Sequence, residues 1–399
     1  MNRREVKRAP VLRFKGFTND WEQHKLGDET NRIKSYSISH GFEVAEDTGT
    51  KYIHYGDIHT SKVKNINNID VLPNIKDNNY KPLKYGDVIV ADASEDYKGI
   101  ADACIVNTIS DSYKIVAGLH TIAFRPKSKL CSKFLYFYLS TDIFKHFGYK
   151  TGTGLKVFGI SYKELAKFKL KEPSVTEQKK IVKLLFLIEK AINLQQRKLK
   201  LLKEIRKGIV ENIRDNNFEY KEQKNDFKDV KIKDMFKITR GKVLPKEKIS
   251  SNKISPNIYP VFSSQTLNNG LLGFYKDYLF QNAITWTTDG ANAGTVNFRN
   301  EKFYSTNVNG VLLQKEIKPD LLTADLLNLV AFKYVSKVGN PKLMNNTMAN
   351  IRIKIPSNTN ARIFYSKILN KYDTKIDFIN KKIDYLTTFK RFLLQNMFI

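Results

Sequence analysis

The feature that most constrains this fold is a long helical pattern that occurs twice, once in the middle of the sequence and once at its end. Residues 174–213 contain no proline and a single glycine, Gly208. Apolar side chains recur there alternately four and three positions apart, which is the spacing of a coiled-coil seam. The seam consists of Ile181, Leu185, Ile188, Ile192, Leu199, Leu202 and Ile209, with Ile205 supplying the step that falls on Arg206.

The last segment, residues 357–399, repeats this pattern about 184 positions later. Its seam consists of Leu369, Ile376, Ile379, Ile383, Leu386 and Leu393. A helix of roughly 38 residues is about 57 Å long, far longer than the average globular helix. We expect the two helices to pack against each other as a coiled coil. The alternative is that each lies as an amphipathic helix on its own domain.

The segments that precede the two helices also match in order. "DWEQHKLGD", residues 20–28, is similar to "DFKDVKIKD", residues 226–234. Short runs rich in β-branched and aromatic residues follow and predict strands. They are "YIHYGDI", "DVIVADA", "ACIVNT" and "HTIAFRP" in the first half, and "IYPVFSS", "NAITWTTDG", "GTVNFRN" and "NGVLLQ" in the second.

Each half then predicts one amphipathic helix, "SKFLYFYLSTDIFKHFGY" or "DLLTADLLNLVAFKYVSKV", a glycine-containing loop, and a strand that ends on proline. The predicted fold class is therefore α+β, with two similar mixed α/β domains and two long helices in an internal repeat. The expected boundaries are a first domain at 1–173, a central helix at 174–213, a charged linker at 214–228, a second domain at 229–356 and a C-terminal helix at 357–399.

The charge balance favours a polyanionic partner. The chain has 68 Lys and Arg residues against 40 Asp and Glu residues, which gives a formal net charge of +28. Such an excess concentrates nucleic acid around a protein. The alternative is a lysine-rich solvated surface, on a structural scaffold whose charge is incidental.

The sequence lacks the residue patterns that most kinds of active site require. Cys104 and Cys131 are too few for a disulfide framework or a zinc site, the six histidines lack metal-ligand spacing, and no phosphate-binding loop occurs. The glycine-rich "FGYKTGTGL" follows a helix, which is the wrong context for a cofactor loop. We therefore expect no metal and no cofactor bound by this chain.

One enzymatic alternative stays open, a metal-dependent DNA nuclease. The segment "DVIVADASEDYKG" contains Asp87 and the cluster from Asp92 to Lys98, which includes Asp96. Carboxylates and a lysine beside a short strand can hold a cation that activates water against phosphate. The simpler interpretation is a polar loop after a strand.

No secretory signal or run of about 18 apolar residues occurs, so we expect a cytoplasmic protein.

Several segments together resemble the specificity (S) subunits of type I restriction-modification systems, along the whole chain. They are "RFKGFTNDWEQHKLGD" at residues 13–28, "PSVTEQKKI" at the start of the central helix, "LLKEIRKG" near its end and "KRFLLQNMF" at the C-terminus. The resemblance implies two target recognition domains, each reading one half of a bipartite, asymmetric double-stranded DNA site. It also implies that the helices form an antiparallel coiled coil that sets the spacer.

The same resemblance implies partners and cofactors. Two modification subunits would carry S-adenosylmethionine, methylate adenine and dock on the helices, whose polar Lys and Glu face is the expected docking surface. Two restriction subunits would supply ATP- and Mg-dependent translocation and cleavage. The S chain itself would be non-catalytic. The second repeat departs from the pattern, with Asn360-Ala361 where the first has Glu177-Gln178, and Phe392 where the first has Gly208.

DNA contact requires Arg or Lys toward guanine, Asn or Gln toward adenine, and further basic groups toward phosphate. The candidates are Lys62, Lys64, Tyr97, Lys98 and Lys156 in the first domain, and Arg240, Lys242, Lys246, Asn292, Arg299 and Lys342 in the second.

Overall fold

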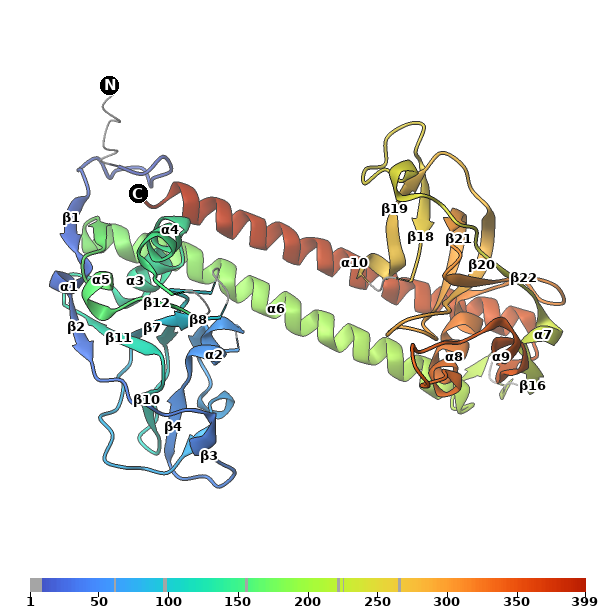
Figure 1. Ribbon diagram of the computed structural model, residues 1–399, viewed down its shortest axis with the longest axis horizontal. Coiled ribbons are helices and arrows are strands. Elements are labelled where there is room, and N and C mark those ends of the chain that lie inside the picture. The colour runs from blue at the N-terminus through green and yellow to red at the C-terminus, as the bar shows by residue number, and fades with distance from the viewer. Residues whose placement is uncertain are drawn as a thin grey trace. The chain divides into compact units, whose positions relative to one another are not determined.

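The structure is a computed structural model that describes residues 9–60, 62–95, 99–154, 157–220, 223–224, 226–264 and 267–399. The chain divides into two compact units (Figure 1). Unit 1 contains residues 1–194 and 383–399, and unit 2 contains residues 195–382. Each unit is mixed α/β and includes parts of two long helices, α6 (Val175–Arg214) and α10 (Thr359–Asn396). The predicted fold class is confirmed.

Unit 1 is built on a sheet with the strand order β2-β11-β7-β9-β5. A second sheet has the order β10-β4-β6-β3, and two pairs, β1-β13 and β12-β8, complete the described strands. The strands are β1 (Glu22–Lys25), β2 (Thr30–Ile33), β3 (Glu43–Val44), β4 (Thr50–Ile53), β5 (Asn65–Ile66), β6 (Asn74–Ile75), β7 (Val88–Ala91), β8 (Ala93–Ser94), β9 (Ala103–Val106), β10 (Lys114–Ala117), β11 (Thr121–Pro126), β12 (Phe158–Gly159) and β13 (Lys169–Glu172).

The main sheet of unit 1 is apolar on both faces because its strands alternate between two cores. In β7, Val88 and Val90 join the core that contains the helices, whereas Ile89 and Ala91 face the second sheet. The short helices of this unit are α1 (Leu26–Glu29), α2 (Tyr55–His59), α3 (Ser132–Leu139), α4 (Asp142–Thr151) and α5 (Tyr162–Leu165).

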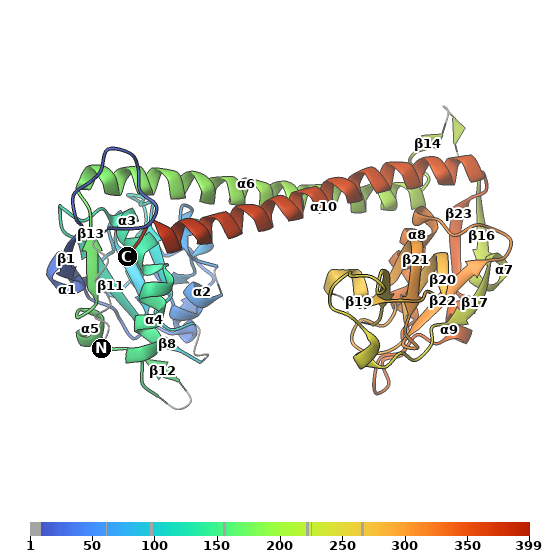
Figure 2. The ribbon, with the colours of Figure 1, turned by 90° about the horizontal axis from the view of Figure 1, so that it is seen from above.

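Unit 2 is built on a sheet with the order β17-β22-β20-β21-β18-β19, and helix α8 packs against β21 (Figure 2). Its strands are β14 (Glu219–Tyr220), β15 (Gln223–Lys224), β16 (Phe227–Lys231), β17 (Phe236–Arg240), β18 (Tyr259–Phe262), β19 (Leu271–Tyr275), β20 (Phe280–Thr287), β21 (Val296–Ser305), β22 (Asn309–Gln314) and β23 (Arg352–Pro356). Its short helices are α7 (Ile232–Met235), α8 (Leu321–Ala331) and α9 (Asn345–Asn350), with single turns η3 (Lys246–Lys248) and η5 (Phe332–Tyr334).

The two units share one topology. The order β2-β11-β7-β9 in unit 1 corresponds to β17-β22-β20-β21 in unit 2. In each unit the strand that precedes the first short helix pairs antiparallel with the strand that leads into a long helix, as β1 with β13 and β16 with β23. The short helix that follows is fixed by the same backbone bond, from Leu26 N–H to Phe168 O in unit 1 and from Ile232 N–H to Ile351 O in unit 2. The repeat in the sequence is therefore a repeat of structure.

The structure differs from the sequence predictions at two places in unit 1. The single helix predicted across residues 132–149 is two helices, α3 and α4, because the Thr141 hydroxyl caps a new helix by accepting from Phe144 N–H. The predicted strand "YIHYGDI" ends at Ile53, and its second half forms α2. No helix in the described residues is long and apolar enough to cross a membrane.

Candidate nucleic-acid interface

The start of α6 is fixed by the Glu-Gln pair of the first repeat. Glu177 is buried and accepts two bonds from the Arg13 guanidinium, at 2.7 and 2.8 Å. The Gln178 carboxamide accepts from Cys131 N–H at 2.8 Å and donates to the carbonyls of Lys129 and Pro173. These bonds join the helix start to the N-terminal arm and to the segment that enters α3.

The second repeat uses a different residue for the same task. Arg362 is buried in α10 and donates to Pro356 O at 2.9 Å, just as Gln178 donates to Pro173 O. It also lies 3.6 Å from the carboxylate of Asp320, which caps α8. The departure at Asn360-Ala361 therefore leaves the helix anchored through another side chain.

The predicted seam residues lie on the inward faces of the two helices. Ile181, Leu185 and Ile188 share a core with Leu393 in unit 1, and Ile209 packs on a core that contains Leu369 in unit 2. Within the helices, buried positions are Ile181, Leu185, Ile188, Leu369, Ile379 and Leu393, and partly buried positions are Ile192, Leu199, Leu202, Ile209, Ile376, Ile383 and Leu386. The start of α6 packs against the end of α10 in unit 1, and the end of α6 packs against the start of α10 in unit 2, so the helices are antiparallel within each unit.

One step of the seam differs from the prediction. Ile205 was expected to supply it, but its side chain is 48% exposed. Arg206 lies inward instead and donates to the carboxylates of Asp325 in α8 and Asp373 in α10, both at 2.8 Å. Burial raises the pKa of Asp325 to about 6, against the lowering effect of Arg206.

A second ion pair, also partly buried, joins the helices in unit 1. Lys390 in α10 donates to Glu189 in α6 at 2.6 Å. The number of residues from Glu189 to Arg206 along α6 equals the number from Asp373 to Lys390 along α10. Each unit therefore has its own ion pair between α6 and α10, Glu189 with Lys390 in unit 1 and Arg206 with Asp373 in unit 2, at matching spacings in the sequence.

In unit 2 the loops that carry several DNA-contact candidates converge at one edge of the sheet, which is formed by the C-terminal ends of β17 and β20 and the start of β22. Arg240 ends β17 opposite Gly310, and Thr287 ends β20 opposite Asn309. The backbone N–H of Lys242 donates to Ser305 O, and Gly290 N–H donates to Pro341 O, which adjoins Lys342. Gly241 leaves no room for a side chain, because a Cβ atom there would lie 2.1 Å from Thr306 O.

This edge brings together Arg240, Lys242, Lys342 and the turn that contains Asn292. Arg240, Lys242 and Lys342 are exposed, whereas Asn292 is half-buried. Lys246 is exposed in η3, farther along the loop after β17, and Arg299 is buried within β21.

In unit 1 the candidates are less well defined. Lys64 is exposed beside β5, and the exposed Lys62 ammonium lies 3.2 Å from Asp57. Tyr97, Lys98 and Lys156 lie outside the described residues, as does Asp96 of the nuclease alternative. Asp87 is fully buried and bonded twice to Arg125, at 2.8 and 2.7 Å, so it holds strands together.

Four histidines that are isolated in the sequence meet around Tyr55. His40 and His54 lie ring against ring at 4.1 Å, and His59 and His120 pack on the Tyr55 ring. Burial lowers the pKa of His54 to about 4. His59 and His120 contact Asp102 and Asp92 respectively, and the histidine spacing gave no sign of this cluster.

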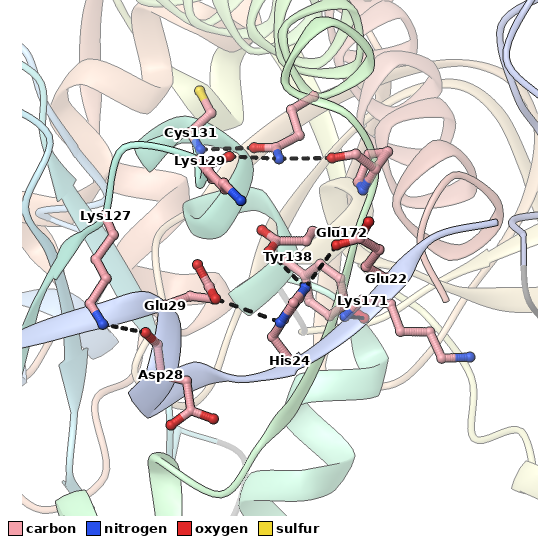
Figure 3. A network of polar contacts seen from close by, with 12 residues as sticks. Glu22, His24, Asp28, Glu29, Lys127, Lys129, Cys131, Tyr138, Lys171 and Glu172 are labelled. Carbon is pink, nitrogen blue, oxygen red and sulfur yellow. Dashed lines mark hydrogen bonds and ion pairs between the residues drawn. The ribbon is translucent and has the colours of Figure 1, made fainter. Parts of the chain in front are cut away.

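A polar network lies where β1, α1 and β13 meet (Figure 3). His24 lies 3.3 Å from Glu22 and 3.5 Å from Glu172 through one ring nitrogen, and 3.6 Å from Glu29 through the other. The ligand atoms of His24, Glu29 and Glu172 all lie within 4.8 Å of one another, close enough to share a small cation. Burial, reinforced by Glu29, raises the pKa of Glu172 to about 7.

Two copies of one mixed α/β domain, each packed on part of the same two helices, define a tandem-repeat protein with two similar surfaces. Residues 18–204 and 224–388 each match the family described as type I restriction modification DNA specificity domain. The chain therefore belongs to this family. It is a DNA-binding specificity subunit of the type I restriction-modification class, and the predicted family is confirmed.

Individual relatives agree. A putative type I specificity subunit N-terminus from Mycoplasma pneumoniae is 46% identical over 134 residues, which are 33% of this chain and 70% of that relative. A second putative subunit from the same organism is 42% identical over 32% of this chain and 34% of its own length. The solved S subunit of a type I system from M. genitalium covers 98% of this chain and 99% of its own, with a TM-score of 0.67 at 13% identity, and so shares the fold.

Proposed function

We propose that this chain recognises a bipartite DNA site, with each target recognition domain reading one half. The repeat of topology carries the proposal, because two related domains in one chain present two related surfaces. The domains have diverged, since β18 pairs with β21 as β5 pairs with β9, but β19 then extends the main sheet of unit 2, and the second sheet of unit 1 (β10-β4-β6-β3) has no counterpart among the described strands of unit 2. The two half-sites would therefore differ in sequence.

We further propose that α6 and α10 set the spacer between the half-sites. α6 has 40 residues and α10 has 38, so each is about 60 Å long. Equivalent positions on one face of DNA recur every 34 to 36 Å or so. The ion pairs between α6 and α10 would prevent one helix from sliding along the other, and the helix length would then set the distance between the two recognition domains.

Exposed apolar side chains on the outer faces of the helices support the proposal that modification subunits, which would methylate adenine, dock there. Leu187 and Leu194 are exposed on α6 within unit 1. On α10, Tyr385, Phe389 and Phe392 are exposed and their rings stack in series, with centroids 6.3 and 6.4 Å apart. Apolar and aromatic groups of this kind mark protein interfaces. The proposed docking surface is thus apolar as well as rich in Lys and Glu.

In this proposal the chain itself is non-catalytic and works in the cytoplasm. Two modification subunits would bring S-adenosylmethionine, and two restriction subunits would bring ATP and Mg. The role of Asp87 in an ion pair with Arg125 supports this division, because that carboxylate is not available to a catalytic cation.

Gel shifts of the full chain, with and without modification subunits, test the proposal. We expect a preference for some duplex sequences and a fall in affinity of roughly 10³- to 10⁵-fold between low and moderate salt, since about 6 to 10 phosphates are neutralised. Equal binding to all duplexes with the partner present would overturn it. A Mg²⁺-dependent cut by the chain alone that is lost in Asp92→Ala would favour the nuclease instead.

A further inference from the structure

The sheet of unit 2 has a polar hollow on the face that α8 does not cover. In β20, Ile284 and Trp286 face the helical core, so Thr285 and Thr287 face the other way. Together with Asn297, Arg299 and Asn309 these threonines line a cavity of about 180 Å³. The corresponding strand of unit 1, β7, is apolar on both faces. The hollow is therefore a feature of the second domain and not of the shared fold.

Arg299 is the unusual group in this hollow. Its residue is 9% exposed, and its guanidinium carbon lies 3.7 Å from the centre of the Phe262 ring. One terminal nitrogen donates to Asn269 O, whereas Nε has no hydrogen-bond partner. In the part of the chain that the structure describes, no carboxylate lies within ion-pair distance of Arg299, and Glu301 on the same strand attracts it only from farther away. Burial lowers the pKa of Arg299 to about 10, so the side chain stays cationic at neutral pH.

Burial of a cation with no carboxylate in direct contact is unfavourable, so the charge of Arg299 indicates the class of ligand. An oxyanion would neutralise Arg299 and accept hydrogen bonds from it. The hydroxyl group of Thr287 adds a donor, and the Asn309 side chain, whose buried oxygen has no partner, can turn its amino group toward an anion. A neutral ligand would leave the charge of Arg299 uncompensated.

The position of the hollow indicates where the anion comes from. Asn309 and Thr287 form the last pair of the β20-β22 ladder, at the edge that carries Arg240. The carbonyl of Asn309 accepts from Gly241 N–H, and the next residue is Lys242. A DNA strand that followed these basic loops would pass beside the hollow.

We propose that the Arg299 hollow is an oxyanion site that takes a phosphate group. In the working protein this would be a backbone phosphodiester of the half-site that the second domain reads, which rests on the proposed function. The phosphate would position the domain on the duplex, because phosphate contacts fix register and bases supply specificity.

Thermal unfolding of the full chain tests the site without DNA. Inorganic phosphate, compared with chloride at equal ionic strength, should raise the melting temperature of the wild type by about 2 °C or more. Arg299→Gln should lose this rise, and Arg299→Lys, which keeps the charge, should retain part of it. Lys302→Gln is the matched control, an exposed cation on the same strand, and should respond as the wild type does. An equal rise in Arg299→Gln, or none in the wild type, would overturn the oxyanion site.

A phosphate scan of the cognate duplex then separates the two sources. A single neutral methylphosphonate at the right position should weaken wild-type binding about tenfold and should not weaken Arg299→Gln further. If inorganic phosphate stabilises the wild type but no position in the scan interacts with Arg299, the site takes free anions only and the DNA assignment is wrong. If the wild type binds all duplexes alike, the proposed function fails, while the thermal test still decides the oxyanion site.

Discussion

At the scale of single residues, two arginines, Arg206 in α6 and Arg362 in α10, lie inward among the apolar side chains of the long helices and donate hydrogen bonds to groups outside their own helix or at its start. The seam could be read from spacing alone, because heptad periodicity depends only on where apolar side chains fall. The inward position of Arg206 could not be predicted from spacing, since it depends on Asp325 and Asp373, which come from two other helices. Arg362 was missed for the same reason, although it stands 184 positions after Gln178 and carries out the same task.

Glu172 gives a residue-scale prediction about pH. Its folded-state pKa of about 7 lies above the ordinary value of 4.5 for a glutamate, and it faces Glu29 from α1, His24 and Glu22 from β1, and Lys129 before α3. A carboxyl with a raised pKa is favoured in its protonated form by folding, so its contribution to stability falls as pH rises from about 4.5 through 7. Glu172→Gln should therefore raise the free energy of unfolding by about 1 to 3 kcal/mol above pH 7 and change it little near pH 5.

Urea unfolding at several pH values measures this effect. Glu22→Gln is the control, because the Glu22 side chain is 82% exposed and meets the same histidine. A Glu172→Gln variant that is less stable than the wild type at pH 8 would show that the buried carboxylate is a favourable partner of His24.

At the scale of elements, the helix pair is held by apolar contacts and by two partly buried ion pairs. Arg206→Ala should destabilise unit 2 by about 1 to 3 kcal/mol, because it leaves the partly buried carboxylates of Asp325 and Asp373 without their cation. Arg214→Ala should cost less than about 1 kcal/mol, since Arg214 pairs with Asp215 at the surface. Chemical denaturation followed by circular dichroism measures both. Equal losses would mean that Arg206 acts as a surface residue.

The order of elements was predictable, and their boundaries less so. The strand runs "DVIVADA", "ACIVNT" and "HTIAFRP" correspond to β7, β9 and β11, because buried strands are continuous apolar runs. The break between α3 and α4 was missed because apolar residues continue on both sides of Thr141, so periodicity concealed the cap. The hollow at Arg299 was also missed, since it depends on which face of the sheet a helix covers.

At the scale of the whole molecule, the sequence repeat and the net charge of +28 indicated two similar domains and a nucleic-acid partner, and the resemblance of several segments to type I specificity subunits indicated the class of protein. A repeat of topology within one chain explains how one polypeptide can present two different readers. The bases that each reader contacts depend on loop side chains, whose individual positions follow no periodic pattern.

Mapping methylated adenines is the most direct test of this account. The experiment uses two bacterial strains. In the first, this chain is the only specificity subunit that the genome encodes. In the second, it is replaced by a variant that lacks residues 193–199 and 380–386. That deletion removes one heptad from each helix and keeps Glu189 with Lys390 and Arg206 with Asp373. We predict two short sequences separated by a fixed spacer in the wild type, and the same two sequences with a different spacer in the variant. A continuous motif, or a spacer that does not change, would contradict the account.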